Sequence, residues 1–508
     1  MEVILAGYNL DRELIADLAR ATKEGPSRDK TSSPLDPDSL TPETLSAAYA
    51  RISRDPRPIP ELRADARQDV ARARKSNTQI VFGFGHASVA EHAVFNFDIL
   101  GISRLAIEAL EASRLGSYTE KSQRYILLER DALVPPEIAG TPWEAEFRAL
   151  LADQHEGYRR AYERLVQAYE SVHPEQWADA RARRELQGAA KEDARYFLAL
   201  ATTGQLGATM NARTLEGTVR RLAADPLSEV RELGERLHTA VASIAPSLVR
   251  HTEADAYRRD TPSAVRARLQ DLGVDRLAKA NADRSADLAN GLESARGDLA
   301  SAVRLIGFSP DGETDLIAAL ISEALDLSWA RARERAAACP REEREAIVRE
   351  CLARLTRHDA PMRAFELPDF TYELIVSASC FAQLKRHRLA TLLPQPYRPH
   401  LGITIPPAFA DTGLERDLTE ACARSEALYR RIASVHPEAA VYALTNAHRR
   451  RVILKVNARE LYHVARLRMD RHAQWDIRVV ATEMIRQARE RAPLVMMAAM
   501  GKDEFGQA

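Results

Sequence analysis

The sequence predicts an α+β protein made of two homologous domains, each an antiparallel or mixed sheet packed with helices, and helix-rich overall. Three observations predict this class: strand-like alternation, helical stripes and a weak internal repeat. The chain has 508 residues, which is long for one domain and comfortable for two. We place the domains at 1–255 and 301–505, joined by a charged, Ala-rich helical connector at 256–300.

A strand followed by a helix is the clearest local pattern in the first half. Residues 92–100 alternate, with Phe95, Phe97 and Ile99 on one face, which is typical of a half-buried strand. Apolar residues then recur at helical spacing over 102–110. We also expect helices over 145–170 and 227–245, and a mobile surface excursion over the Pro-, Ser- and Asp-rich residues 24–42.

The second half repeats the first weakly. Four features recur in the same order in both halves, so chance is a poor explanation. The pairs are 3–18 with 303–320, 92–100 with 370–377, the helix after each of these strands, and "MNARTL" (210–215) with "VNAREL" (456–461). This agreement indicates two homologous domains.

Composition narrows the function classes. The net charge is −1, so no global field attracts nucleic acid or a membrane surface. No apolar run is long enough for a membrane span, and the N-terminus lacks the features of a signal peptide. The 4 Cys form no C-x-x-C pair and no zinc spacing, which favours a reduced, cytoplasmic setting without a metal site.

Three motifs carry candidate chemistry, and each has a structural alternative. "GFGHASVAEH" (83–92) has no metalloprotease spacing, and otherwise fits a loop entering a strand. Arg386, His387 and Arg388 stand at a helix end, where they either stabilise the helix dipole or clamp a phosphate. Residues 456–478 predict one long helix or a broken pair, whose Asn and His are unusual choices for a solvated face.

Taken together, these residues resemble the flavin-dependent thymidylate synthase (ThyX) family. "GHASVAEH" matches the family's GHxSxxEH element, and "SRLGSYTEKSQRY" (113–125) matches the second half of its RHRxxSxNxxSxRY signature. "VNAREL…RLRMDRHAQWDIR" (456–478) matches its late NxRxL…R…AQxEIR element. The resemblance spans both domains and follows the family order.

The departures from the family are complementary. The first domain has Ala112, Ser113 and Arg114 where the family has Arg-His-Arg, and Leu222 replaces the late Arg. The second domain keeps Arg-His-Arg but lost the SxRY element. Because family sites lie between subunits of a homotetramer, the resemblance implies one composite site between the two domains, and a homodimer that forms a pseudo-tetramer of four domains.

The resemblance carries over site residues position by position. The first domain would supply Glu120, Ser122, Arg124 and Arg195 to the nucleotide, and the second Gln383, Arg386 and Arg468, with Arg468 also catalytic. The expected flavin-binding residues are Ser53, His86, Ser88, Glu91, Arg386, His387, Arg388, Asn457, Arg459 and His463, the last replacing a family Asn.

The implied reaction is reductive methylation of dUMP at C5 to dTMP, with FAD as cofactor and methylenetetrahydrofolate and NADPH as co-substrates. A small-molecule nucleotide, and neither nucleic acid nor a membrane, is thus the expected partner. Two alternatives stay open. One is a flavoenzyme that modifies another pyrimidine nucleotide, UMP or dCMP. The other is an inactive paralogue that only binds nucleotide or flavin.

Overall fold

The computed structural model describes residues 1–24, 39–273 and 299–505, so most of the predicted excursion at 24–42 and of the connector at 256–300 lies outside the described residues. The chain forms two compact units, each made of separate segments. Unit 1 consists of 1–122, 128–144 and 201–276. Unit 2 consists of 123–127, 145–200 and 277–508.

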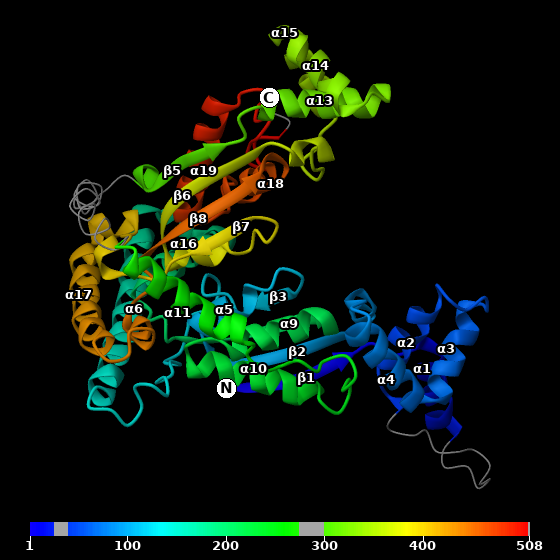
Figure 1. Cartoon of the computed structure of the whole chain (residues 1–508). Coiled ribbons are helices and arrows are strands. Elements are labelled where there is room, and N and C mark those ends of the chain that lie inside the picture. The colour runs from blue at the N-terminus through cyan, green and yellow to red at the C-terminus, as the bar shows by residue number, and fades with distance from the viewer. Residues whose placement is uncertain (25–38, 274–298, 506–508) are drawn as a thin grey trace. The chain divides into compact units, whose positions relative to one another are not determined.

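Each unit is built on a four-stranded sheet (Figure 1), and every strand pair is antiparallel. In unit 1 the order is β1-β2-β4-β3, with bounds Glu2–Tyr8, Val94–Ser103, Thr203–Asn211 and Ser117–Glu120. In unit 2 it is β5-β6-β8-β7, with bounds Val303–Phe308, Asp369–Ser377, Arg449–Asn457 and Thr391–Pro394. The two sheets therefore share one strand order, and the predicted α+β class is confirmed.

Matching irregularities and caps recur in the two sheets. The register shifts between Leu5 and Gly7 in one sheet and between Leu305 and Gly307 in the other. The strands β2 and β6 each end in a serine whose side chain caps the next helix, and β4 and β8 each end in an asparagine that does the same. These four caps are Ser103, Ser377, Asn211 and Asn457. The short repeat motifs thus mark equivalent strand-to-helix junctions.

The predicted alternation matches the buried faces. Phe95, Phe97 and Ile99 on β2 are buried, while Asn96 and Asp98 between them are exposed. The same holds for the apolar positions of β6, which join the core of unit 2 with α16, α18 and α19. Burying a large apolar side chain contributes about 1.5–3 kcal/mol, so these strands anchor their sheets.

Helices make up most of both units. In unit 1 they are α1 (Arg12–Glu24), α2 (Glu43–Arg51), α3 (Ile59–Gln68), α4 (Val70–Asn77), α5 (Arg104–Glu111), α9 (Ala212–Ala223), α10 (Ser228–Val241) and α11 (Ala256–Asp271). In unit 2 they are α7 (Pro174–Ala178), α8 (Ala180–Ala194), α13 (Gly312–Leu325), α14 (Trp329–Ala338), α15 (Arg341–Leu352), α16 (Ala378–Leu384), α17 (Leu414–Ala433), α18 (Ala458–Arg468) and α19 (Trp475–Arg491). Helix α6 (Glu144–Val172) lies in unit 2 from residue 145 onward.

Local predictions were refined in two places. The polar stretch at 117–120, within the family-like element 113–125, forms the edge strand β3, paired with β4. Residues 456–478 form the broken pair, because α18 ends at Arg468 and α19 begins at Trp475. The helices expected at 145–170 and 227–245 are α6 and α10.

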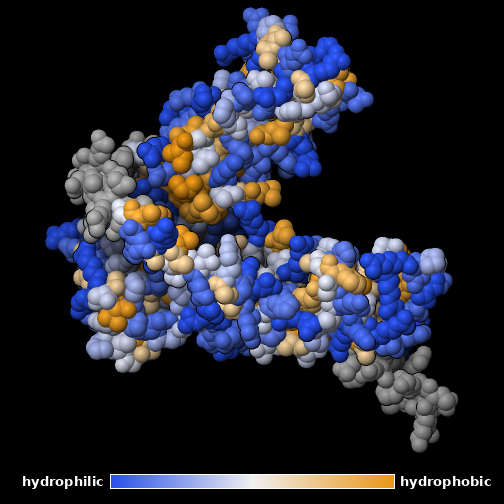
Figure 2. All heavy atoms as spheres, viewed as in Figure 1, coloured by the Kyte–Doolittle hydropathy of each residue, from blue (hydrophilic) through white to orange (hydrophobic). Residues whose placement is uncertain are grey.

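The surface over α13, α14 and α15 is mainly hydrophilic (Figure 2), as their many exposed charged side chains require. Within the described ranges, no helix combines the length and the apolar character that crossing a bilayer demands.

Residues 145–200 of the first half pack within unit 2. The backbone N–H of Leu200 donates to the carbonyl of Leu444 (2.8 Å), and that of Asn446 donates to the carbonyl of Leu198 (2.8 Å). The buried amide of Gln154 on α6 donates to Ser425 Oγ (2.8 Å) and to the carbonyl of Ala443 (3.0 Å). Unit 2 therefore contains segments from both halves of the sequence.

Candidate active site

The Arg-His-Arg segment follows directly on α16. Ser377 caps this helix, accepting from the backbone N–H of Cys380 (2.9 Å), and the helix ends at Leu384. His387 is buried, whereas Arg386 is exposed. The short helix therefore delivers one buried imidazole and one solvent-facing guanidinium at its C-terminal end.

Arg468 is held in place by two acceptors at the end of α18. Its Nε donates to His387 Nε2 (3.0 Å), and its Nη2 donates to the backbone carbonyl of Gln383 (3.1 Å). Burial, then the nearby cations Arg386 and Arg124, lower the pKa of Arg468 to about 10. The guanidinium stays charged at neutral pH, in a place where an added anion would relieve the repulsion among these three arginines.

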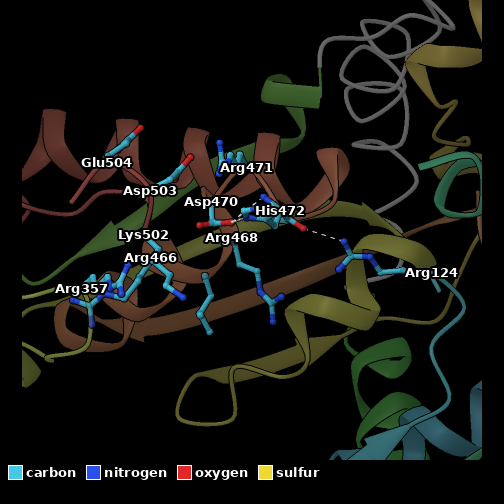
Figure 3. A pocket seen from close by; sticks show the side chains of 12 residues that line it. Arg124, Arg357, Arg466, Arg468, Asp470, Arg471, His472, Lys502, Asp503 and Glu504 are labelled. Carbon is cyan, nitrogen blue, oxygen red and sulfur yellow. Dashed lines mark hydrogen bonds and ion pairs between the residues drawn. The ribbon is translucent and has the colours of Figure 1, made fainter. Parts of the chain in front are cut away.

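Arg124 comes from the first half of the sequence and lies in unit 2. It forms an ion pair with Glu192 on α8, and its Nη2 donates to the backbone carbonyl of His472 (3.0 Å). These contacts hold the Arg124 guanidinium against the loop between α18 and α19, which contains His472. Figure 3 shows Arg124 pointing toward His472.

Arg124 and Arg468 line the same pocket, which has a volume of about 750 Å³ (Figure 3). Most of its lining side chains are charged. The full lining is Arg124, Arg357, Arg466, Leu467, Arg468, Asp470, Arg471, His472, Ala473, Lys502, Asp503 and Glu504. Cations outnumber carboxylates in this set, so the pocket suits an anionic ligand of nucleotide size.

A buried hydrogen-bond network holds the segment that carries Arg195. Next to Arg195, the fully buried Tyr196 donates its hydroxyl to Asp476 Oδ2 (2.8 Å) and accepts from Gln474 Nε2 (2.8 Å). Gln474 Oε1 in turn accepts from Gln383 Nε2 (2.8 Å). One chain of bonds therefore links residues 195–196 to the helix that precedes Arg386.

Asp476 also accepts from Ser377 Oγ (2.6 Å), the cap of α16. Burial is the largest influence on this carboxyl and raises its pKa. The ring of Tyr196 stacks on Trp475, with centroids 5.8 Å apart. The indole N–H of Trp475 donates to Asp193 Oδ1 (2.7 Å), and burial raises the pKa of Asp193 to about 7. These contacts fasten the end of α8 to the start of α19.

Four residues expected at the flavin lie on the same part of unit 2. Asn457 Oδ1 accepts from the backbone N–H of Glu460 (2.9 Å), so its oxygen serves as a helix cap. Arg459 donates to the carbonyl of Pro361 (2.7 Å) and pairs with Glu366 (3.0 Å). Arg388 is half-buried and His463 is exposed. The cations and amide donors here match the chemistry of a phosphate-bearing cofactor.

The remaining predicted residues lie in unit 1, which is described separately. Ser53 follows α2 and is exposed, as are His86 and Ser88 around the 3₁₀ segment Ala87–His92. Glu91 forms an ion pair with Arg213 at the start of α9 (2.6 Å). Glu120 ends β3 opposite Leu206, and Ser122 follows it. Within unit 2 the structure thus joins Arg468 to His387 and Gln383 and places Arg124 in the same pocket as Arg468, whereas Arg195 and Arg386 are not among the residues that line this pocket. Within unit 1 it joins Glu91 to Arg213.

One cluster has donor atoms at metal-binding spacing: His387, Glu460 and His463, whose ligand atoms lie within 4.8 Å of one another. Both nitrogens of His387 are already engaged, because Nδ1 lies 3.2 Å from Glu460 Oε1 and Nε2 accepts from Arg468. A cation here would also face the Arg468 guanidinium. The geometry therefore favours a hydrogen-bond relay over a metal site.

Sequence reasoning missed Glu460, Tyr196 and Asp476. Asp476 stands inside the "AQWDIR" motif and Tyr196 follows Arg195, so both were close to residues already singled out. Glu460 occupies a variable position of the NxRxL element, and its counterpart in the first half is Thr214. Charged and hydroxyl groups of this kind are normally solvent-facing, and nothing in their spacing signals burial.

The two antiparallel sheets, their matching helix caps and the arginine-lined pocket define an α+β protein with a site suited to an anionic ligand. Residues 38–247 and 310–494 match the model of the family described as "Thymidylate synthase complementing protein". The chain belongs to this family, as the sequence resemblance predicted. It is accordingly an enzyme of the flavin-dependent thymidylate synthase type, in the methyltransferase class.

Relatives fall into two length groups. A "UPF0159 protein" of Chlamydia muridarum is 26% identical over 434 residues, covering 83% of this chain and 80% of that protein. A flavin-dependent thymidylate synthase of Clostridium tetani is 27% identical over 223 residues, covering 44% of this chain and 86% of that protein. A crystal structure of a UMP/dUMP methylase from Streptomyces cacaoi matches 39% of this chain and 95% of that chain at 20% identity, with a TM-score of 0.33.

Proposed function

We propose that the chain is a flavin-dependent enzyme that methylates dUMP at C5 to give dTMP, using methylenetetrahydrofolate and NADPH. One observation carries the proposal. Arg124 and Arg468, far apart in the sequence and each expected at the nucleotide, line a single pocket of unit 2. The name of the Clostridium tetani relative supports the same reaction.

In this proposal the nucleotide phosphate binds the arginines contributed by both halves. A nucleotide monophosphate carries close to two negative charges at neutral pH, and guanidinium groups pair with it bidentately. Arg124 and Arg386 both lower the pKa of Arg468, so the three cations lie close enough to share an anion's field. Arg195 and Gln383 complete the phosphate and base contacts, together with Glu120 and Ser122.

Arg468 would act on the pyrimidine. Its two acceptors, His387 Nε2 and the backbone carbonyl of Gln383, fix the guanidinium so that little reorganisation is needed when charge develops on a base carbonyl oxygen. Arg388, Asn457, Arg459 and His463 would hold the flavin from this half. When bound, the flavin supplies the hydride chemistry, and the protein supplies binding and orientation.

The proposal needs no cysteine nucleophile. Cys380 on α16 is fully buried, and burial raises the pKa of its thiol well above the usual range. It is a small residue of the hydrophobic core of unit 2. We further propose that the two halves arose by duplication and diverged into domains at 1–255 and 301–505, that two chains form a pseudo-tetramer, and that the enzyme works in the cytoplasm.

The test is a tritium-release or product assay with dUMP, UMP and dCMP as separate methyl acceptors, after FAD loading. We expect turnover with dUMP, and at least a 100-fold loss in Arg124→Ala and in Arg468→Ala. Arg354→Ala is the control, because Arg354 forms only an exposed helical pair with Glu350. Turnover with UMP or dCMP but not with dUMP would show that dUMP is not the methyl acceptor. A protein that neither binds FAD nor methylates any of the three nucleotides would support the inactive paralogue.

A further inference from the structure

Glu460 makes a contact that the proposed reaction does not explain. It stands in the first turn of α18 with its side chain only 8% exposed. Its Oε1 lies 3.2 Å from His387 Nδ1. On the opposite side of the same imidazole, Nε2 lies 3.0 Å from Arg468 Nε. Glu460, His387 and Arg468 thus form a chain of hydrogen bonds that runs from a carboxylate through an imidazole to a guanidinium.

The donors and acceptors in this line fix one arrangement. Arginine only donates, so His387 Nε2 must present its lone pair to Arg468. The proton of the neutral ring therefore sits on Nδ1 and is donated to Glu460. Burial of His387 and the neighbouring Arg468 favour this neutral form by lowering the pKa of the imidazole. Glu460, through the ring, increases the basicity of the nitrogen that accepts from Arg468.

We propose that Glu460 is a positioning residue that acts through His387 to fix the Arg468 guanidinium over the bound pyrimidine. The positioning of Arg468 over a pyrimidine rests on the proposed function, whereas the hydrogen bonds from Glu460 through His387 to Arg468 do not depend on it. Carboxylate–imidazole pairs fix ring orientation and tautomer in many enzyme sites. Here the group they orient is a guanidinium.

Two other roles for Glu460 predict different behaviour. An acidic residue in the first turn stabilises a helix through its dipole, whatever its side chain contacts. A metal site of His387, Glu460 and His463 would use a lone pair of His387 and displace Arg468. The relay instead requires the Nδ1–H tautomer of His387 and a dependence of that tautomer on Glu460.

The structural test is ¹⁵N NMR of the full chain with ¹⁵N-labelled histidine, with the His387 signals identified by their loss in His387→Gln. We expect a neutral Nδ1–H tautomer that persists in Glu460→Gln, whose amide oxygen still accepts, and is lost in Glu460→Leu. An Nε2–H tautomer in the wild type would overturn the relay. So would movement of the His387 signals when Zn²⁺ is added, because that outcome identifies a metal site.

The kinetic test asks what the relay does for turnover. Glu460→Gln should lower kcat about tenfold with little change in the KM for dUMP, and Glu460→Leu should lower it further. Glu415→Gln, in the first turn of α17, is the control for a dipole effect and should leave kcat unchanged. Equal kcat in wild type and both Glu460 variants would overturn the positioning role. If the wild type does not methylate dUMP at all, the proposed function fails while the NMR result still decides the relay.

Discussion

Replacing Tyr196 by phenylalanine should destabilise unit 2 by roughly 2–4 kcal/mol, because the hydroxyl serves two buried partners. It donates to Asp476 Oδ2 and accepts from Gln474 Nε2, both at 2.8 Å. Removing it leaves one N–H of the buried Gln474 amide unsatisfied, and Ser377 Oγ is then the side-chain donor that still serves Asp476. Each unsatisfied buried group costs about 1–3 kcal/mol, and a carboxylate lies at the upper end.

Tyr372→Phe is the matched control. Tyr372 is equally buried in unit 2, but its hydroxyl makes one bond, to the backbone carbonyl of Met484 (2.9 Å). Both changes delete one oxygen from a buried ring, and the control should cost about 1 kcal/mol.

The assay is urea unfolding followed by the fluorescence of Trp475, which stacks on Tyr196, with the other three of the chain's 4 tryptophans replaced by phenylalanine. Unchanged m-values would license the comparison. A cost of Tyr196→Phe no greater than that of Tyr372→Phe would refute the claim that this hydroxyl joins the segment at 195–196 to α19.

Three further predictions concern titration and stoichiometry. Burial raises the pKa of Asp193 from 3.8 to about 7, so the folded state keeps this proton over a pH range in which the unfolded state has lost it. The free energy of unfolding should therefore fall as the pH rises from about 4 to about 7. Urea titrations should show a smaller fall in Asp193→Asn. Arg468 remains charged up to a pKa of about 10, so dUMP affinity measured by calorimetry should stay level from about pH 7 to 9 and weaken below about pH 6, where the phosphate gains a proton. If the two halves contribute complementary residues to one site, FAD titration should end at one flavin per chain, and an endpoint of two would refute that division of labour.

Periodic patterns predicted the scaffold well because they report burial on one face. The alternation at 92–100 and 370–377 identified β2 and β6, and the asparagines of the two late motifs proved to be helix caps at equivalent junctions. Such local signals depend on neighbouring residues alone, so a single sequence is enough to read them.

Contacts between residues far apart in the sequence could not be predicted from local patterns. Nothing in the local sequence indicates that Arg124 meets Glu192 and the loop at His472, or that Tyr196 contacts Asp476. The family resemblance brought Arg124, Arg195 and Arg468 into one hypothesis, but it did not indicate the residues that hold them, such as Glu460 beside His387. Their burial results from tertiary packing, which neither composition nor spacing encodes.

The make-up of unit 2 has a consequence for any attempt to divide the protein. Cutting the chain in the connector at 256–300 would look harmless, since it separates two sequence repeats. Yet residues 123–127 and 145–200 belong to unit 2, so each fragment would carry part of the same fold. The second fragment would lack α8 and Tyr196, whose contacts bury Asp476. The second fragment should therefore depend on the first to complete unit 2, and a gene fission at this boundary would couple two polypeptides rather than release an independent enzyme.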